Sequence, residues 1–195
     1  MPERTKDELL FERAVGGDQT AFLQLYEEHR KAIFRFAYRI LGSRELAEDI
    51  THDCFLSLIR KPESFDSARA SLRTYLYAAA RNLSLKHFRD FGRETAIEEL
   101  TAQPAIPVSE EPLAKLLDAE LALKVQEAVS SLPPLQREAL VLYEYEGLTL
   151  NEIASVVGAD VGAVKARLHR ARQRLKNKLR AYLNTSREIV TLEKA

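Results

Sequence analysis

Hydrophobic residues recur at helical spacing over most of this chain, and few stretches alternate as a half-buried strand would. Three helices are expected in the first half, over residues 21–41, 44–61 and 72–89. Gly42 and Ser43 interrupt the period between the first two, and Pro62 ends the second. Together these signals predict an all-α fold.

The second half keeps the same period and adds the signals of two helices joined by a tight turn. A helix is expected from Pro134 to Gly147, and Thr149 caps a short helix that ends at a turn over residues 158–160. A longer helix begins at Val161. A short helix, a tight turn and a longer helix predict a helix-turn-helix. Its expected core is Ile153, Val157, Val161, Val164 and Leu168.

Composition limits the class of protein. The chain has 195 residues, 46% of them hydrophobic, which is enough for one or two small packed domains. Cys54 is the single cysteine and excludes an internal disulfide. No apolar run is long enough to span a membrane, and the N-terminus is too charged for a signal peptide. A soluble, cytoplasmic protein is therefore expected.

Charged residues are distributed unevenly along the chain, although its 29 basic and 29 acidic residues give no net charge. Residues 94–120 contain seven acidic residues, one basic residue and three prolines, as in a linker. We therefore expect two small helical domains joined by a flexible acidic linker, with loose relative placement. The expected division is an N-terminal domain over 1–93, a linker over 94–120, a helix-turn-helix domain over 121–183 and a tail over 184–195.

The last helix is the most basic segment. Residues 164–182 contain eight Lys or Arg and no Asp or Glu, whereas a solvated helix usually mixes both signs. Val164 and Leu168 share its inward face, so small residues and cations point outward and suit a major groove. The candidate DNA-binding residues are Gly162, Lys165, Ala166, Arg167, His169, Arg170, Arg172 and Lys176.

A second row of candidate residues lies on the helix over 72–89. Tyr75, Asn82, Lys86 and Arg89 share one stripe, where they can stack on a base, bond to its edge and hold phosphates. Taken alone, an ordinary solvated flank with one half-buried tyrosine is the simpler interpretation.

Catalytic and metal chemistry find no support in the sequence. His52, Asp53 and Cys54 are consecutive on a helix and therefore point in different directions, so a buried structural cysteine is favoured over a metal site. No phosphate-binding glycine loop or nucleophile–base pair is present. We expect no enzyme activity, no cofactor and no metal.

Four segments together resemble the extracytoplasmic-function (ECF) sigma factors, which direct bacterial RNA polymerase to promoters. In chain order they are GDQTAFLQLYEEHR, AEDITHDCFLSLIR, SLRTYLYAAARN and SLPPLQREALVLYEYEGLTLNEIASVVGADVGAVKARLHRARQRL. The resemblance implies core RNA polymerase (the β′ clamp and the β subunit), promoter DNA and an anti-sigma factor as partners.

The resemblance also implies roles for individual residues. Asp49, Asp53 and Phe55 fall in the segment that docks on the polymerase clamp. The loop over 64–71 and the helix after it fall in the part that recognises and melts the promoter −10 element. The implied −10 residues are Arg69, Ser71, Tyr75, Arg81, Asn82, Lys86 and Arg89. The helix from Val161 corresponds to the reader of the −35 element.

Two departures and two alternatives stand beside this interpretation. Tyr75 occupies a position where many family members have tryptophan, and His169 occupies one that is often apolar or aromatic.

One alternative function is that of a stand-alone helix-turn-helix regulator; the other is that of a protein whose basic helix binds an acidic partner or RNA. The acidic linker favours a sigma factor, because it suits the basic nucleic-acid channel of polymerase.

Overall fold

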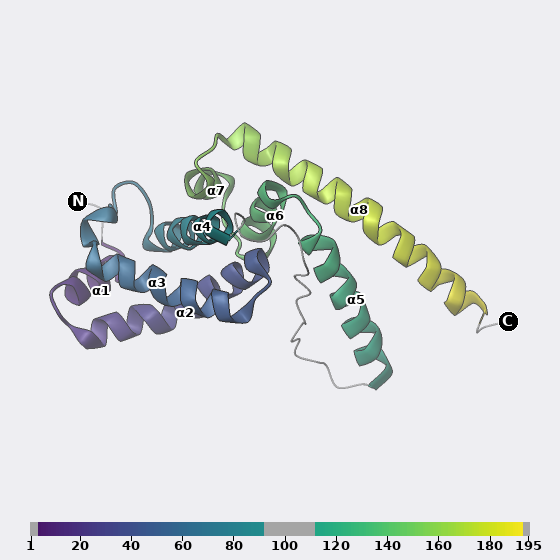
Figure 1. Cartoon of the computed structure of the whole chain (residues 1–195), viewed down its shortest axis with the longest axis horizontal. Coiled ribbons are helices and arrows are strands. Elements are labelled where there is room, and N and C mark those ends of the chain that lie inside the picture. The colour runs from purple at the N-terminus through teal and green to yellow at the C-terminus, as the bar shows by residue number, and fades with distance from the viewer. Residues whose placement is uncertain (1–3, 92–111, 193–195) are drawn as a thin grey trace.

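The computed structural model describes residues 4–91 and 112–192, with side chains for 4–89 and 121–180, and every regular element in these ranges is helical (Figure 1). The all-α prediction is thus confirmed. The N-terminal helices are α1 (Lys6–Val15), α2 (Gln19–Leu41), α3 (Arg44–Arg60), the short 3-10 helix η1 (Pro62–Ser64) and α4 (Leu72–Phe91). The C-terminal helices are α5 (Pro112–Ser130), α6 (Pro134–Leu140), the π-helical turn η2 (Val141–Tyr145), α7 (Leu150–Val157) and α8 (Val161–Leu192).

Local signals set the corner between α2 and α3. The Asp18 carboxylate caps α2 by accepting hydrogen bonds from the backbone N–H groups of Thr20 (2.9 Å) and Ala21 (3.1 Å). Gly42 ends α2 with φ 74°, a conformation that glycine adopts without strain, and the Ser43 hydroxyl then caps α3. This tight corner lies at the interruption that the sequence predicts, and it lets the two helices pack along each other.

The N-terminal core lies between α2, α3 and α4. Phe36 of α2, Leu58 of α3 and Leu76 of α4 are fully buried. Tyr77 is buried with them, its ring 5.4 Å from that of Phe36 in an edge-on arrangement. Leu72 and Ala80 of α4 are buried as well, so this helix turns a wide face toward the core.

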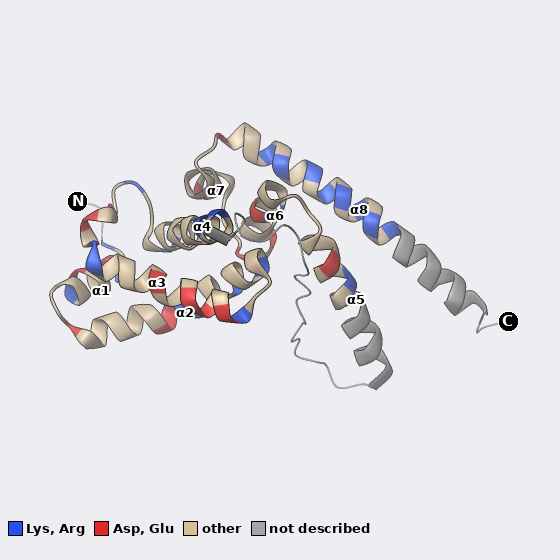
Figure 2. Ribbon diagram, in the orientation of Figure 1, with Lys and Arg blue, Asp and Glu red and all other residues tan. Residues whose placement is uncertain are grey.

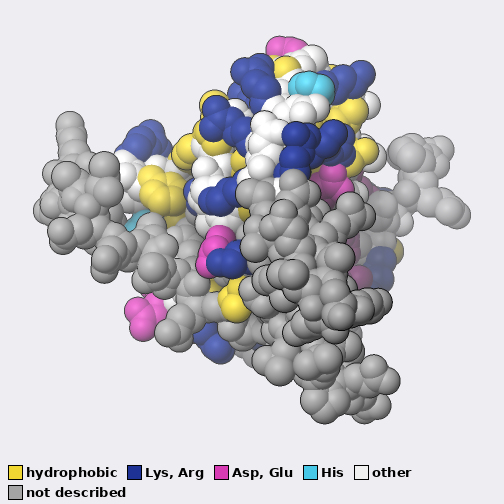
Figure 3. Space-filling view, turned by 90° about the vertical axis from the view of Figure 1, so that its right-hand side faces the viewer, with side chains coloured by type: hydrophobic (Ala, Val, Ile, Leu, Met, Phe, Trp, Pro, Cys, Tyr) yellow, Lys and Arg dark blue, Asp and Glu magenta, His cyan; other side chains and the backbone are white. Residues whose placement is uncertain are grey.

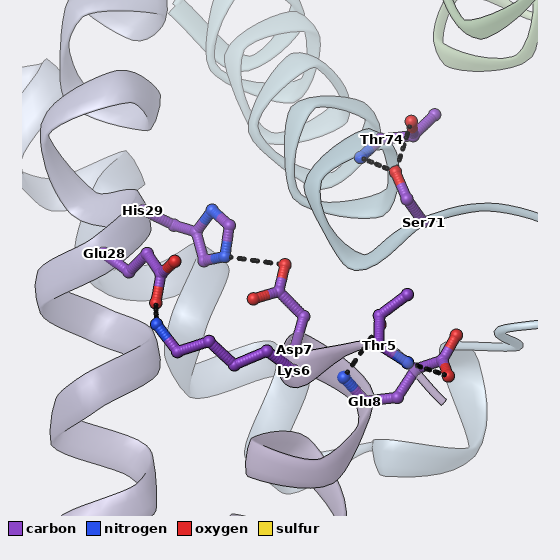
Figure 4. Close-up of polar contacts among 8 residues, drawn as sticks. All are labelled: Thr5, Lys6, Asp7, Glu8, Glu28, His29, Ser71 and Thr74. Atoms are coloured by element: carbon purple, nitrogen blue, oxygen red, sulfur yellow. Dashed lines mark hydrogen bonds and ion pairs between the residues drawn. The ribbon is translucent and has the colours of Figure 1, made fainter. Parts of the chain in front are cut away.

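Helix α1 was not expected, although a capping signal precedes it. The Thr5 hydroxyl accepts from the Glu8 backbone N–H, and the Glu8 carboxylate accepts from that of Thr5. Two polar contacts then hold α1 against α2, from Lys6 to Glu28 at 2.6 Å and from Asp7 to His29 at 3.0 Å (Figure 4). The pattern Thr-x-x-Glu was the available signal.

The helix-turn-helix is confirmed at its predicted bounds. Thr149 and Glu152 form a capping box at the start of α7, and Gly158 ends α7 with φ 63°. The Asp160 carboxylate accepts from the Ala163 backbone N–H at 2.8 Å, so it caps α8. Four of the five expected core residues are buried, namely Ile153, Val157, Val164 and Leu168, and Val161 is half-buried.

Three helices differ from the expectation, and one of them is α8, which continues to Leu192 through most of the expected tail over 184–195. Helix α5 begins at Pro112, inside the stretch expected as linker, because proline is favoured at a first helical position and the following residues are good helix formers. Residues 94–111 of that stretch include none that the structure describes. The helix expected up to Gly147 widens after Leu140 into η2, where the Glu146 backbone N–H bonds to the Val141 carbonyl at 3.1 Å.

The two halves are in direct contact, contrary to the loose placement expected from the sequence. Helix α4 packs on α7, and α2 reaches α6 and η2 (Figure 1). The buried apolar residues of both halves form one continuous cluster. Helix α8 runs away from this junction toward the C-terminus.

Candidate polymerase and nucleic-acid interfaces

The outer side of α8 is formed by small and basic residues. Val164 and Leu168 are buried against the rest of the domain, as predicted, and Ala171 is buried with them. The exposed candidates are Gly162, Lys165, His169, Arg170, Arg172 and Lys176, and Ala166 is half-buried. Figure 2 shows blue bands and no red ones along the described part of α8, and Figure 3 shows Lys and Arg side chains gathered at the top of the end-on view. Such a face attracts an anionic backbone.

Arg172 and Arg167 of α8 lie close to other parts of the domain. The Arg172 guanidinium donates to a Glu144 carboxylate oxygen from two nitrogens, at 2.7 and 3.0 Å, and lies 5.1 Å from the Tyr143 ring centroid. Arg167 is half-buried, and its Nη1 atom is buried without a hydrogen-bond partner among the described residues. Arg167 therefore lies on the inner flank of α8.

The stripe expected on α4 is mostly open to solvent. Asn82, Lys86 and Arg89 are exposed, and Tyr75 is half-buried. Three of the four side chains are therefore accessible to a nucleic-acid strand that lies along α4. The exposed positions allow the nucleic-acid contacts that the helical spacing suggests, and these contacts remain a prediction.

Tyr75 connects α4 to the loop over 64–71. Its hydroxyl lies 2.6 Å from the Ser64 hydroxyl, and its ring is 5.5 Å from that of Phe65 in an edge-on arrangement. Phe65 in turn contacts Phe11 of α1 at 5.1 Å. Three aromatic rings thus support the loop from beneath, a role for α1 and Phe65 that sequence reasoning missed.

The remaining loop candidates have local partners. The Ser71 hydroxyl accepts from the Thr74 backbone N–H at 3.2 Å and so caps the start of α4 (Figure 4). Arg69 is highly exposed and pairs with Asp66 at 3.5 Å. Arg69 is available to a ligand, whereas the Ser71 hydroxyl already has a structural role.

Arg81 does not face the open stripe. It points to the C-terminal domain, where it forms an ion pair with Glu138 of α6 and is only 16% exposed. Burial raises the pKa of Glu138, and the hydrogen bond from Arg81 and the charge of Arg167 oppose that shift. In this structure Arg81 is a contact between the domains.

The acidic face of α3 presents two of the three expected docking residues. Asp49 and Asp53 are exposed one turn apart, whereas Phe55 is 1% exposed and packs edge-on against Tyr26 at 5.0 Å. Leu56 takes the outward position instead and is 43% exposed. It borders a groove of about 270 Å³ between α3 and α4, which Asp53, Ser57, Arg60, Lys61 and Leu83 complete.

Two of the three residues considered as metal ligands have other partners. The Cys54 thiol is buried and donates to the Leu76 carbonyl at 3.4 Å, and burial raises its pKa to about 12. His52 lies 3.2 Å from the Tyr26 hydroxyl. Among the described residues, no cluster of side chains is suited to a metal ion, and no helix is long and apolar enough to cross a membrane.

Family models match both halves of the chain. Sigma-70 region 2 matches residues 25–94, and Sigma-70, region 4 matches residues 122–175. The first range includes α3 and α4, and the second includes the helix-turn-helix. The chain belongs to the ECF RNA polymerase sigma factors. Its two halves are thus the region 2 and region 4 domains of a sigma factor.

Named relatives support the assignment along the chain. ECF RNA polymerase sigma factor SigW of Bacillus subtilis (strain 168) is 32% identical over 177 residues, covering 84% of this chain and 91% of SigW. ECF RNA polymerase sigma factor SigE of Mycolicibacterium smegmatis (strain ATCC 700084 / mc(2)155) is 33% identical over 169 residues, which is 84% of this chain. The matched part spans 64% of that SigE sequence, slightly less than two thirds.

Solved structures of sigma factors share the fold. The sigma factor RpoE from Bartonella quintana, in complex with the anti-sigma factor NepR, is 26% identical with a TM-score of 0.65, over 82% of this chain and 96% of that chain. CnrH in complex with the cytosolic domain of CnrY is 27% identical with a TM-score of 0.65, over 90% and 97% of the two chains. Either alignment is longer than one domain, so the likeness includes both.

Proposed function

We propose that this ECF sigma factor acts in the cytoplasm, where it binds core RNA polymerase and directs promoter-specific initiation. The region 2 domain, over 1–93, would dock on the β′ clamp through α3 and recognise the −10 element with the 64–71 loop and α4. The helix-turn-helix domain, over 121–183, would read the −35 element with α8, and the β subunit would be a further partner of the chain. The part of the expected linker that precedes α5, over 94–111, would connect the two domains.

One observation supports this function: two sigma-type domains of one chain each expose basic side chains. Residues 161–180 of α8 contain no acidic residue and expose basic side chains on a folded helix-turn-helix, and α4 exposes an amide and two cations beside the aromatic-supported loop. A protein that recognises two promoter elements needs two such surfaces. The acidic face of α3 would serve a basic surface of the polymerase.

The chain would supply specificity, and phosphodiester synthesis would remain with the polymerase. An anti-sigma factor is the expected regulator, because the sigma factors RpoE and CnrH were solved with the anti-sigma factor NepR and with the cytosolic domain of CnrY, respectively. Each of these two proteins is bound to a sigma factor with the same fold as this chain. Residues 184–192 continue α8, so most of the expected tail over 184–195 extends the last helix of the helix-turn-helix domain.

Transcription in vitro tests the function as a whole. Core polymerase and the purified chain are incubated with genomic fragments, and specific transcripts should appear only when both proteins are present. Tight, specific binding of the chain alone to duplex promoters, with no core-dependent transcripts, would identify a stand-alone regulator instead.

Base reading by α8 is tested by −35 library selection with holoenzyme at two salt concentrations. Lys165→Ala and Arg170→Ala should each cost roughly 1–3 kcal/mol and relax the preference at particular base pairs. Lys176→Ala should weaken binding to all sequences alike and reduce the salt slope by about one charge. If the selected −35 consensus is unchanged for the first two variants, α8 binds the DNA backbone through its charges and does not read bases.

A further inference from the structure

Four arginines of the N-terminal domain converge on the C-terminal domain. We call this set the arginine face: Arg35 and Arg39 of α2, and Arg73 and Arg81 of α4. Glu146 of the C-terminal domain lies against it with a side chain that is 2% exposed. Its carboxylate lies 3.0 Å from Arg39 and 4.0 Å from Arg35, while Arg73 donates to its backbone carbonyl.

The remaining contacts extend the same surface. Glu138 pairs with Arg81, as described above. The Tyr77 hydroxyl donates to the Glu146 carboxylate at 2.8 Å, and the Thr74 hydroxyl to that of Glu152 at 3.5 Å. Blue bands of α4 lie beside a red band of α6 where the domains meet (Figure 2). The junction thus pairs cations of one domain with carboxylates of the other.

This closed arrangement cannot read a whole promoter. The −10 and −35 elements are centred about 25 base pairs apart, which is roughly 85 Å along B-DNA at 3.4 Å per base pair. In the closed chain α4 is in direct contact with α7, and only residues 158–160 separate α7 from α8. If the chain functions as proposed above, the domains must separate on a promoter, and the arginine face then loses its carboxylates.

We propose that the arginine face is a binding site for the nucleic-acid backbone, and that Glu138 and Glu146 occupy it as phosphate stand-ins while the chain is closed. Guanidinium groups bind carboxylates and phosphates through the same forked hydrogen bonds. Residues 29–41 and 72–89, which contain all four arginines, include no Asp or Glu. Once the domains separate, these two segments contain no acidic side chain that could pair with the arginines in place of a phosphate.

The position of the face on α4 favours a nucleic acid over an acidic protein segment. Arg73 and Arg81 are spaced i, i+8 and share one side of α4, and Arg81 directly precedes Asn82 of the exposed stripe. A strand whose bases lie on that stripe has its phosphates within reach of the flanking cations. The DNA contacts of α4 therefore extend around the helix beyond the stripe.

The first test measures binding of the full-length chain to a fluorescein-labelled single-stranded DNA of mixed sequence, by anisotropy over a salt series. Glu138→Gln with Glu146→Gln should open the chain, seen as a larger radius of gyration in X-ray scattering, and should tighten DNA binding. Each phosphate contact on a single strand contributes a slope of about 0.7, or roughly fivefold in affinity at 0.1 M salt.

Arginine variants then locate the site in that opened background. Arg39→Gln with Arg73→Gln should weaken binding about 25-fold at 0.1 M salt and lower the slope by about 1.4. Arg44→Gln is the matched control, because Arg44 is exposed at the start of α3 outside the arginine face. An equal loss in the control would overturn the proposal. So would an opened chain with unchanged DNA affinity, which would assign the face to an acidic protein partner.

A second measurement does not depend on the glutamate variants, and circular dichroism first confirms that each arginine variant is folded. Holoenzyme made with the Arg39→Gln and Arg73→Gln chain should retain promoter fragments more weakly, and with a shallower salt slope, than the Arg44→Gln holoenzyme. Equal retention by the two holoenzymes contradicts the proposal. Absence of promoter-specific transcripts with the unmodified chain would instead contradict the sigma-factor function, and the single-strand measurement would still decide the role of the arginine face.

Discussion

Neighbouring residues on α3 provide a sharp test of polymerase docking. Phe55 is buried and Leu56 is 43% exposed beside the acidic face, so the two should respond differently to truncation. We expect Leu56→Ala to leave the chain folded and to weaken holoenzyme assembly. We expect Phe55→Ala to destabilise the N-terminal domain, although the family resemblance assigned the docking role to Phe55.

The expected magnitudes follow from burial. Complete burial of a leucine side chain contributes about 1.5–3 kcal/mol, so covering the exposed part of Leu56 contributes roughly 1 kcal/mol, or about fivefold in the dissociation constant. Truncation of a buried phenylalanine costs about 3–5 kcal/mol. In a domain of this size each kcal/mol lowers Tm by about 4–8 °C, so Phe55→Ala should lose about 12 °C or more.

The assay titrates fluorescently labelled chain with core polymerase and records thermal unfolding by circular dichroism in parallel. Leu23→Ala is the matched control, because Leu23 is an exposed leucine of α2. Leu56→Ala should lose affinity at unchanged Tm, while Leu23→Ala keeps both. Wild-type affinity in Leu56→Ala, or a lowered Tm that explains its loss, would refute the assignment of this face.

Three further outcomes are expected. Glu144→Gln should release Arg172 and tighten −35 DNA binding by holoenzyme with a steeper salt slope, and an unchanged slope would mean that Arg172 does not reach a phosphate. Tyr75→Ala and Asn82→Ala should each cost roughly 1–3 kcal/mol on duplex promoters; a template mismatched across the −10 element should restore part of the Tyr75→Ala loss, whereas equal defects on both templates would exclude a melting role. Burial raises the pKa of the Cys54 thiol to about 12, so the neutral thiol contributes stability below the unfolded value of about 8.5, and this is lost as pH rises toward 12; iodoacetamide at about pH 8 should label the urea-unfolded chain and spare the folded one.

Local signals were sufficient for most of the helices. Caps such as Asp18 and Thr149 and helix ends such as Gly42 and Gly158 act through neighbouring backbone groups, so their effect is written in short segments. The inward face of α8 likewise follows from helical periodicity alone. Helix α1 had an equally local signal that was overlooked, and η2 had none, because its π geometry accompanies packing of Val141 and Leu142 into the core.

The sequence alone also determined which sides of α8 and α4 carry cations and amides, since helix geometry fixes neighbours on one face. The sequence did not determine which residues of other helices these faces contact. The pairing of Arg81 with Glu138 and of Arg39 with Glu146 joins residues 57 and 107 positions apart. The exchange of Phe55 for Leu56 as the outward residue likewise depends on how α2 and α4 pack around α3. Contacts of this kind arise only when separate helices are brought together, because burial and ion pairing depend on neighbours in space that no local pattern specifies.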